Sequence, residues 1–229
     1  QDLAKAVEDA SLVILCTPVG GMKDMAAQIK PYLSPEAVVT DVGSVKASVV
    51  ADVEPILPRF VGSHPLCGSE KTGVAHADAE LFEGATCAVT PTEQSDAEAV
   101  VKVNEFWGVL GAKVVNLTTE AHDDIVARTS HLPHVVASAL VNAILGKPVA
   151  GESDFIGTGF TDTTRLASGS PTMWRDIALT NSEAIQKAIN DLQLELSELK
   201  NALATKDGTA LENLFKEGKT LRDQWLEGG

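Results

Sequence analysis

Hydrophobic residues in the first half of the chain follow two alternating patterns. Short, nearly continuous apolar runs, such as SLVILCTP at 11–18, are typical of strands that are buried on both faces. Between these runs, apolar positions recur with the period of an amphipathic helix. We expect strands at 11–18, 37–43, 59–65, 86–92 and 112–118, and helices at 2–10, 23–33, 46–57 and 96–111. Strands that alternate with helices of this length predict βαβ units around a largely parallel sheet.

From Thr119 onward the pattern is helical, and no further strand is expected. Thr118 or Thr119 can cap a helix that runs to about Leu145. Pro133 falls inside this helix and removes one backbone hydrogen bond, so we expect a kink there. The segment that follows, GESDFIGTGFTD at 151–162, is predicted to be a loop.

The last part of the chain is predicted to contain three more helices. Ser170 and Pro171 are expected to begin the first of them, as cap and first-turn residue. Leucines and isoleucines then recur at alternating spacings of four and three, which forms an apolar seam for another helix of the same chain or of a second subunit. The seam consists of Ile185, Ile189, Leu192, Leu196, Leu199 and Leu203. A final helix is expected from Thr209, with Glu212 completing a capping box.

These patterns predict an α/β part followed by an all-α part, with a boundary near residue 118. We expect residues 1–118 to form a partial, Rossmann-like dinucleotide-binding domain with a doubly wound sheet, and residues 119–229 to form a helical domain. Domains of the first type usually open with a strand, a GxGxxG turn and a helix, and the chain contains no GxGxxG. We therefore expect that the first βαβ unit is missing from this chain; the alternative is a fold that never had it.

Charge and cysteine content narrow the classes of partner and compartment. The net charge of −14 would repel nucleic acid and anionic membranes, so neither is an expected partner. No apolar run reaches the roughly 18 residues of a membrane span, and the first ten residues do not resemble a signal peptide. Three cysteines without a CxxC pair argue against disulfides and for a reducing, cytoplasmic location.

Four stretches, in this order, carry a resemblance that covers essentially the whole chain. They are DVGSVK (41–46), GSHPLCGSEKTG (62–73), SHLPH (130–134) and GFTDTTRLASGSPTMWRD (159–176). Together they resemble the prephenate/arogenate dehydrogenase family of tyrosine biosynthesis. The resemblance implies oxidative decarboxylation of prephenate or arogenate with hydride transfer to NAD or NADP. It also implies a nucleotide-binding domain followed by a helical domain that forms a homodimer.

His64 is the candidate catalytic base. The pKa of an unperturbed histidine is near neutrality, so its neutral ring can accept a proton at working pH. His64 lies where a predicted strand ends, at the edge where α/β folds bind ligands, and Pro65 and Gly68 would hold the loop that follows. From the local sequence alone, His64 could instead be a histidine that only stabilises the loop. The resemblance makes His64 the catalytic histidine and places Ser44, otherwise a helix cap, beside the substrate hydroxyl and the catalytic histidine. Ser44 is also a candidate for cofactor binding.

Arg165 is the candidate for holding a substrate carboxylate, because a guanidinium group binds carboxylates in a bidentate manner. The alternative is a surface arginine paired with Asp162, which could also hold or gate it. His131 and His134 are three residues apart and share a helix face. No carboxylate motif accompanies them, so no metal site is expected. The resemblance implies that His134 contacts the substrate. His131 is a second candidate for substrate binding, and its alternative is a buried structural histidine.

The remaining candidates are assigned less directly. Glu70, in the loop after His64, could pair with a pocket arginine and gate entry, or be an exposed acid. Trp174 would line the pocket or pack in the helical core. Thr17, Pro18 and Val19 follow a buried strand, and in similar folds that turn borders the cofactor ribose.

Two other functions stay open on the sequence alone. Because the nucleotide fingerprint is absent, the chain could be a non-catalytic binding or dimerisation module. It could also be another hydroxy-acid oxidoreductase of similar fold, although the combination of HPxxG and TRxxxxxPxxW argues against that. His76 and His122 are predicted to be surface residues, without a role in the site.

Overall fold

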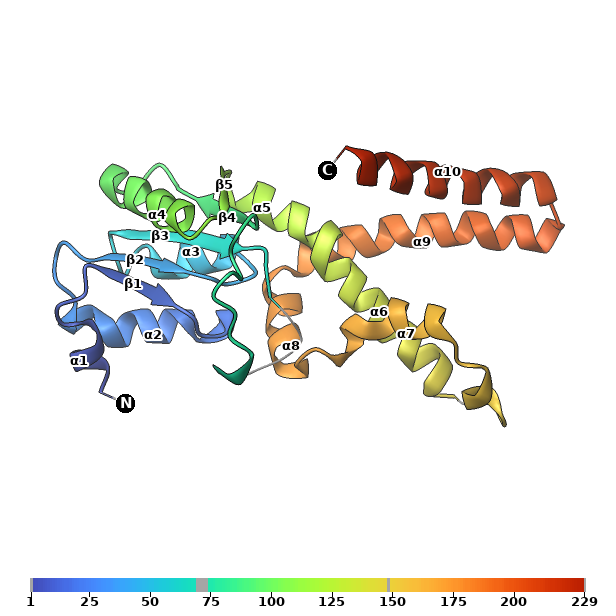
Figure 1. Cartoon of the computed structure of the whole chain (residues 1–229), viewed down its shortest axis with the longest axis horizontal. Helices are drawn as coiled ribbons and strands as arrows, with labels where there is room; N and C mark the ends of the chain where they lie inside the picture. The colour runs from blue at the N-terminus through green and yellow to red at the C-terminus, as the bar shows by residue number, and fades with distance from the viewer. Residues whose placement is uncertain (1, 69–73, 148, 229) are drawn as a thin grey trace. The chain divides into compact units, whose positions relative to one another are not determined.

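The computed structural model describes residues 2–68, 74–147 and 149–228 (Figure 1). The chain forms two compact units, residues 1–185 and residues 186–229.

The first unit is built around a five-stranded sheet in the order β1-β2-β3-β4-β5. The strands are β1 (Leu12–Leu15), β2 (Val38–Asp41), β3 (Phe60–Pro65), β4 (Thr86–Thr90) and β5 (Lys113–Asn116). β1, β2 and β3 are parallel, as are β4 and β5, whereas β3 and β4 are antiparallel. The predicted Rossmann-like, largely parallel sheet is confirmed.

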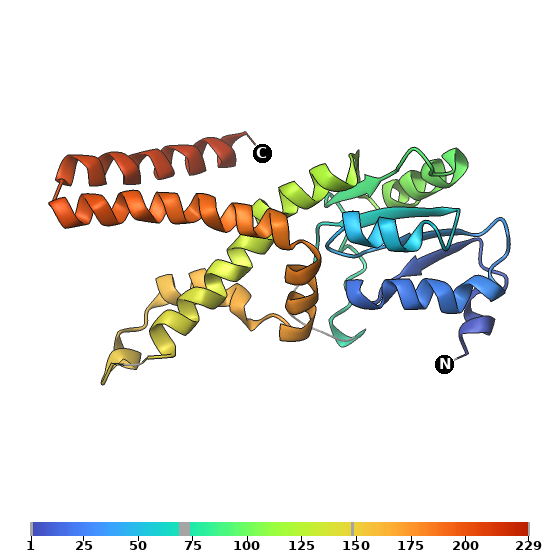
Figure 2. The same cartoon turned by 180° about the vertical axis from the view of Figure 1, so that it is seen from behind.

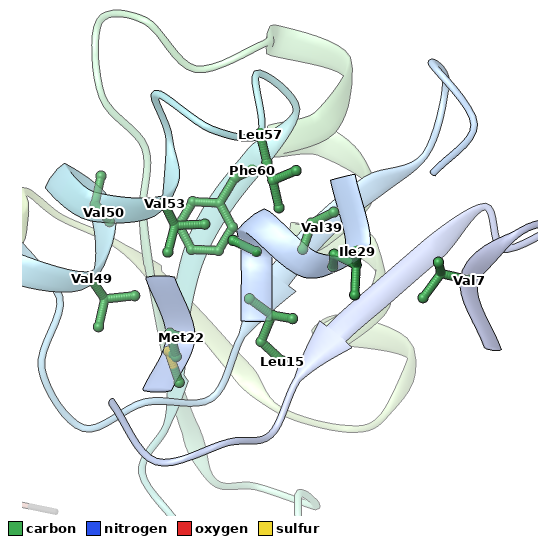
Figure 3. Packing of buried hydrophobic residues seen from close by; sticks show 11 residues of the cluster. Val7, Leu15, Met22, Ile29, Val39, Val49, Val50, Val53, Leu57 and Phe60 are labelled. Carbon is green, nitrogen blue, oxygen red and sulfur yellow. The ribbon is translucent and has the colours of Figure 1, made fainter. Parts of the chain in front are cut away.

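Helices cover both faces of this sheet because neighbouring residues of a strand point to opposite sides. Val39 and Phe60 pack under α2 (Met22–Ile29) and α3 (Ala47–Val53), in the cluster that Figure 3 shows. Val38 and Val61, their neighbours in sequence, pack on the other face against α4 (Ala97–Val109). Figure 1 shows α4 on one side of the sheet and α2 on the other. The sheet is therefore doubly wound, as predicted.

Helices follow the sheet, and the predicted kink takes the form of a wider helical turn. α5 (Thr119–Val126) leads into a π-helical turn (Ala127–His131) and then α6 (Leu132–Leu145). In the wide turn the N–H of Leu132 donates to the carbonyl of Ala127, five residues back. Pro133, in the first turn of α6, has no N–H to donate to a preceding carbonyl, which accounts for the break in the regular ladder.

Two helix starts differ from the prediction. The predicted loop at 151–162 is wrong over its last part, because α7 begins at Thr158 and ends at Thr164. Its threonine hydroxyls donate to carbonyls one turn back, from Thr163 to Gly159 for example, so this polar, glycine-containing stretch is compatible with a helix. α10 (Gly208–Glu227) begins before Thr209, since Asp207 caps it by accepting from the N–H of Ala210. The predicted caps Thr118 and Ser170 are confirmed.

The remaining helices are α1 (Leu3–Val7), α8 (Pro171–Thr180) and α9 (Ser182–Thr205). Residues 186–205 of α9 and all of α10 form the second unit, a helical hairpin whose two arms lie side by side in both views (Figures 1 and 2). Two residues of the predicted seam, Leu196 and Leu203, are 54% and 63% exposed. Further exposed apolar side chains on the hairpin are Leu194, Phe215, Leu221, Trp225 and Leu226. None of the helices described here is both long enough and apolar enough to cross a membrane.

Candidate active site

The turn between β2 and α3 is built on a buried ion pair. Asp41, the last residue of β2, pairs with Lys46, and neither side chain is exposed to solvent. The Asp41 carboxylate also accepts from the N–H of Gly43 at 2.8 Å and from the N–H of Ser63 at 3.0 Å. Lys46 Nζ donates to the carbonyl of Ser63 at 2.8 Å. These bonds fix the turn that follows β2 to Ser63 of β3, the residue that precedes His64.

Gly43 is required in this turn by its neighbours. A Cβ atom at Gly43 would lie 2.9 Å from the Asp41 carboxylate, from the Met22 methyl group and from a methyl group of Val19. Real Cβ atoms do not approach other atoms so closely, so a side chain here would separate the two turns. The turn after β1, which carries Val19, and the turn after β2, which carries Ser44, are thus neighbours at the carboxyl ends of parallel strands.

His64 lies near the end of β3 and is 8% exposed. Its Nδ1 atom is 2.9 Å from Nε2 of His122, and Nδ1 of His122 is 2.7 Å from a carboxylate oxygen of Asp123. Burial lowers the pKa of His64 well below its usual value, and the charge of Lys46 lowers it further, followed by His122 and His131. The ring is therefore neutral at physiological pH and can accept a proton.

Ser44 does not cap α3, which corrects the local reading of its sequence. The start of α3 is instead capped from α5, because the Asp123 carboxylate accepts from the N–H of Lys46 at 2.7 Å and from the N–H of Ala47 at 2.9 Å. The Ser44 hydroxyl is therefore not used to cap the helix. The backbone of Ser44 also lies close to the ring of His131. It raises the pKa of that ring, against the larger, lowering effect of burial.

The rings of His131 and His134 both contact the ring of Trp174. The His131 ring is 1% exposed and meets Trp174 edge-on at 6.0 Å, and Asn181 Nδ2 approaches its Nδ1 at 3.3 Å. Burial lowers the pKa of His131 to about 4. Its Nε2 atom is buried and has no hydrogen-bond partner in the described part of the chain. His134 stacks on Trp174 with ring centroids 3.5 Å apart, and Gly169 lies against both rings.

Arg165 follows α7 directly and begins the short 3-10 helix Arg165–Ser168, which ends at Gly169. Its side chain is exposed, and Asp162, also exposed, precedes it by three residues on α7. Arg165 is thus four residues from the glycine that contacts His134 and Trp174. Glu70 lies outside the described residues. The roles of Arg165, Asp162 and Glu70 stay predictions.

The turn Thr17, Pro18 and Val19 follows β1 and leads into α2. The Thr17 hydroxyl is buried and has no hydrogen-bond partner among residues 2–68, 74–147 and 149–228. Buried hydroxyls normally have a partner, so a hydroxyl left without one suits a bound ligand that carries hydroxyl or amide groups. These are the groups at the nicotinamide–ribose end of a nicotinamide nucleotide. A contact of Thr17 with that end of the cofactor stays a prediction, and the sequence contains no glycine-rich GxGxxG turn.

Sequence reasoning missed the residues that hold the site together. His122 is 1% exposed, so its prediction as a surface residue is wrong. It lies 58 residues after His64, and nothing in its local pattern indicates that the two rings meet. A signal did exist for Asp41 and Lys46, because a charged residue that ends an apolar strand must be paired if it is buried. Both belong to the DVGSVK stretch, in which the sequence analysis makes only Ser44 a candidate.

Comparison with known proteins identifies the family of the chain. The family model described as "Prephenate dehydrogenase, nucleotide-binding domain" matches residues 1–116, and the model described as "Prephenate dehydrogenase, dimerization domain" matches residues 118–217. The chain belongs to the prephenate dehydrogenase family. The predicted membership is thereby confirmed.

Similar members of the prephenate dehydrogenase family include two from bacteria with named activities. A cyclohexadienyl dehydrogenase of Zymomonas mobilis is 35% identical over 226 residues, which cover 96% of this chain and 77% of that protein. A prephenate dehydrogenase of Bacillus subtilis is 36% identical over 225 residues, which cover 95% of this chain and 59% of that protein. The chain thus spans about three fifths to three quarters of the length of these relatives.

Two solved structures of the family share the fold over 98% of this chain. Prephenate dehydrogenase from Aquifex aeolicus, in complex with hydroxyphenyl propionate and NAD+, matches with a TM-score of 0.92 and 38% identity, over 80% of that chain. Synechocystis arogenate dehydrogenase matches with a TM-score of 0.84 and 31% identity, over 82% of that chain. The nucleotide-binding half and the helical half therefore both have family counterparts.

Proposed function

We propose that the protein is a prephenate or arogenate dehydrogenase, which oxidises and decarboxylates its substrate with a nicotinamide cofactor. One observation carries the proposal: the buried, neutral ring of His64 lies at the carboxyl end of β3, beside the turn that carries Ser44. Family membership and the four ordered motifs support the same reaction. The proposal includes a boundary near residue 118 between the nucleotide-binding domain and the helical domain.

In the proposed reaction His64 accepts the proton of the ring hydroxyl through its neutral imidazole. A bound nicotinamide would supply the hydride acceptor for the carbon that bears this hydroxyl. The bond from the ring to its carboxylate then breaks, carbon dioxide leaves, and the bonding electrons complete the aromatic ring. Ser44 contributes a hydroxyl that is not used to cap a helix and can hydrogen-bond the same substrate oxygen. The low exposure of His64 keeps bulk water away from the base.

Substrate binding is assigned to the helical half. Arg165 binds a substrate carboxylate in a bidentate manner, which its exposed position at the end of α7 permits. The stacked rings of His134 and Trp174 form a wall of the pocket, and Gly169 leaves room for them. We keep His131, which is buried beside Trp174, as a candidate for a further polar contact. We keep Asp162 and Glu70 as candidates for holding Arg165 or gating entry.

The nicotinamide end of the cofactor is assigned to Thr17, Pro18 and Val19, together with Ser44. The Thr17 hydroxyl, buried without a partner in the described ranges, would bond the carboxamide or ribose of the cofactor. NAD and NADP are both compatible with this assignment, because the residues that distinguish them follow a different strand. The NAD+ bound to the Aquifex aeolicus relative supports a nicotinamide nucleotide in general.

We also propose that the protein is a homodimer, formed through its helical half. Support comes from the match to a dimerization-domain model and from the exposed apolar side chains of the α9–α10 hairpin. These side chains, which include Phe215 and Trp225, would be covered by the same surface of a second copy.

The proposed function is tested with the full-length gene product, prephenate, arogenate, and both nicotinamide nucleotides. We expect reduced nucleotide to form together with an equal amount of carbon dioxide for at least one of the two substrates. Reduction of nucleotide without carbon dioxide would indicate a different hydroxy-acid oxidoreductase. The absence of turnover with all four combinations would contradict the proposal.

A further inference from the structure

We propose that His122 and Asp123 are positioning residues that set the tautomer and orientation of the His64 ring. The inference rests on the proposed function, because it assigns to His64 the task of accepting a proton. It also makes α5, which lies in the half matched by the dimerization-domain model, a contributor to the base in the other half. Neither residue contacts the reacting atoms in this account.

The direction of the hydrogen bonds follows from the partners of Asp123. One carboxylate oxygen of Asp123 accepts from the N–H of Lys46 and also lies 2.7 Å from His122 Nδ1. An ionised carboxylate only accepts hydrogen bonds, so His122 Nδ1 carries the hydrogen. In the proposal His122 carries this one hydrogen, so its Nε2 is bare and accepts.

The same reasoning continues to His64. His122 Nε2 is 2.9 Å from His64 Nδ1, so His64 Nδ1 must donate. Burial lowers the pKa of His64, and its ring is therefore neutral with only one N–H. The hydrogen is on Nδ1, which leaves the lone pair of His64 Nε2 to accept the substrate proton. Without His122, the ring could adopt the other tautomer, and Nε2 would be a donor unable to act as base.

Asp123 can serve this purpose because it is itself held firmly. Its two carboxylate oxygens accept from the N–H groups of Lys46 and Ala47, at the start of α3, at 2.7 Å and 2.9 Å. Its backbone carbonyl accepts from Asn181 Nδ2 at 2.9 Å. A single carboxylate therefore fixes both the turn that carries Ser44 and, through His122, the ring of His64. The two groups that face the substrate hydroxyl in the proposed function are held by one anchor.

Two substitutions of His122, made in the full-length holoenzyme, separate positioning from packing. His122→Gln keeps a carbonyl that can accept from His64 and an amide that can donate to Asp123. His122→Phe keeps an aromatic ring but has no acceptor. We expect His122→Phe to lower kcat on the order of 100-fold with KM changed less than about threefold, and His122→Gln to retain kcat within about tenfold. His76→Gln, at an exposed histidine of the short 3-10 helix Val74–His76, is the matched control and should leave kcat unchanged. Equal turnover of wild type and His122→Phe would overturn the proposal.

A second measurement does not depend on activity. In chain labelled with 15N in its five histidines, long-range 1H–15N correlation spectra report which ring nitrogen carries the hydrogen. The His64 signals are assigned from a His64→Asn sample. We expect His64 with its hydrogen on Nδ1 at neutral pH, and a shift toward the other tautomer in His122→Phe. Finding His64 protonated on Nε2 in the wild type would overturn the proposal even if the enzyme is active. The predicted tautomer in an inactive protein would instead count against the proposed function alone.

Discussion

Lys46 pairs with Asp41 in a site where neither side chain is exposed, and the carbonyl that Lys46 also binds belongs to Ser63, the residue before His64. A buried cation is thus fixed one residue from the candidate base. Its charge adds to the effect of burial in lowering the pKa of His64. The DVGSVK stretch therefore has two uses: its ends form the ion pair, and its centre presents Ser44.

Lys46→Met is expected to change both the free energy of unfolding and the pKa of His64. Removing one partner of a buried ion pair leaves an uncompensated carboxylate, so the free energy of unfolding should fall by about 3 kcal/mol. Loss of the nearby positive charge should raise the pKa of His64 toward that of a free histidine, measured by NMR titration. Lys23→Met, which breaks the exposed pair with Asp52, is the control and should leave the free energy of unfolding nearly unchanged. A wild-type pKa of His64 in Lys46→Met would contradict this account of the electrostatics.

Stability should decrease as the pH falls from about 6.5 toward 4. Burial lowers the pKa of His131 to about 4 in the folded chain, and the pKa values of His64 and His134 are also lowered. Between the folded and unfolded pKa values the unfolded chain binds more protons, so the contribution of neutral His131 is complete above 6.5 and is lost below it. Guanidinium unfolding at several pH values should show a shallower pH dependence for His131→Gln than for the wild type. His76→Gln is the exposed control, and an identical slope in all three proteins would contradict the prediction.

Gly169→Ala should disturb the wall formed by His134 and Trp174. A Cβ atom there would lie 2.6 Å from Trp174 Nε1 and 3.0 Å from His134 Cε1, so the stacked rings must move. We expect the free energy of unfolding to fall by about 1–3 kcal/mol and KM for the substrate to rise. Gly159→Ala, on α7 with no atom within 4 Å of the new Cβ, should leave KM unchanged and stability equal or slightly higher. Equal effects of the two substitutions would show that crowding at the rings is not the cause.

Arg165→Gln should weaken substrate binding far more than it slows chemistry. Loss of a bidentate, charge-assisted contact predicts a rise in KM of about 30- to 100-fold, with kcat reduced less than about tenfold. Steady-state kinetics of the full-length protein measures both constants. Arg222→Gln, at an exposed arginine of α10, is the control. A kcat that falls with KM unchanged would remove Arg165 from carboxylate binding.

The parts of the fold that local sequence determines could be predicted. The five strands were found because residues such as Val38 and Val39 bury both faces of the sheet, which leaves a continuous apolar run. Helix starts at Thr118 and Ser170 were found because a cap bonds within its own first turn. The start of α7 was missed because threonines and glycines resemble a loop, although their hydroxyls are satisfied inside the helix.

The site could be predicted only where a motif carries its own chemistry. His64 was singled out from its place at a strand end, and the structure puts it in one cluster with the turn of Ser44. The partners that tune and orient it could not be found in this way. Asp123 lies 77 residues from the N–H of Lys46 that it binds, and polar residues on a helix are usually solvated. Contacts of this kind depend on how separate elements pack, which local patterns do not record.

The central claim is that His64 accepts the substrate proton, and His64→Asn tests it most directly. Asparagine is of similar polarity but cannot take up a proton at neutral pH. In the full-length enzyme we expect kcat to fall on the order of 1,000-fold while KM stays within about threefold, since the base acts in the chemical step. A turnover number equal to that of the wild type would contradict the account.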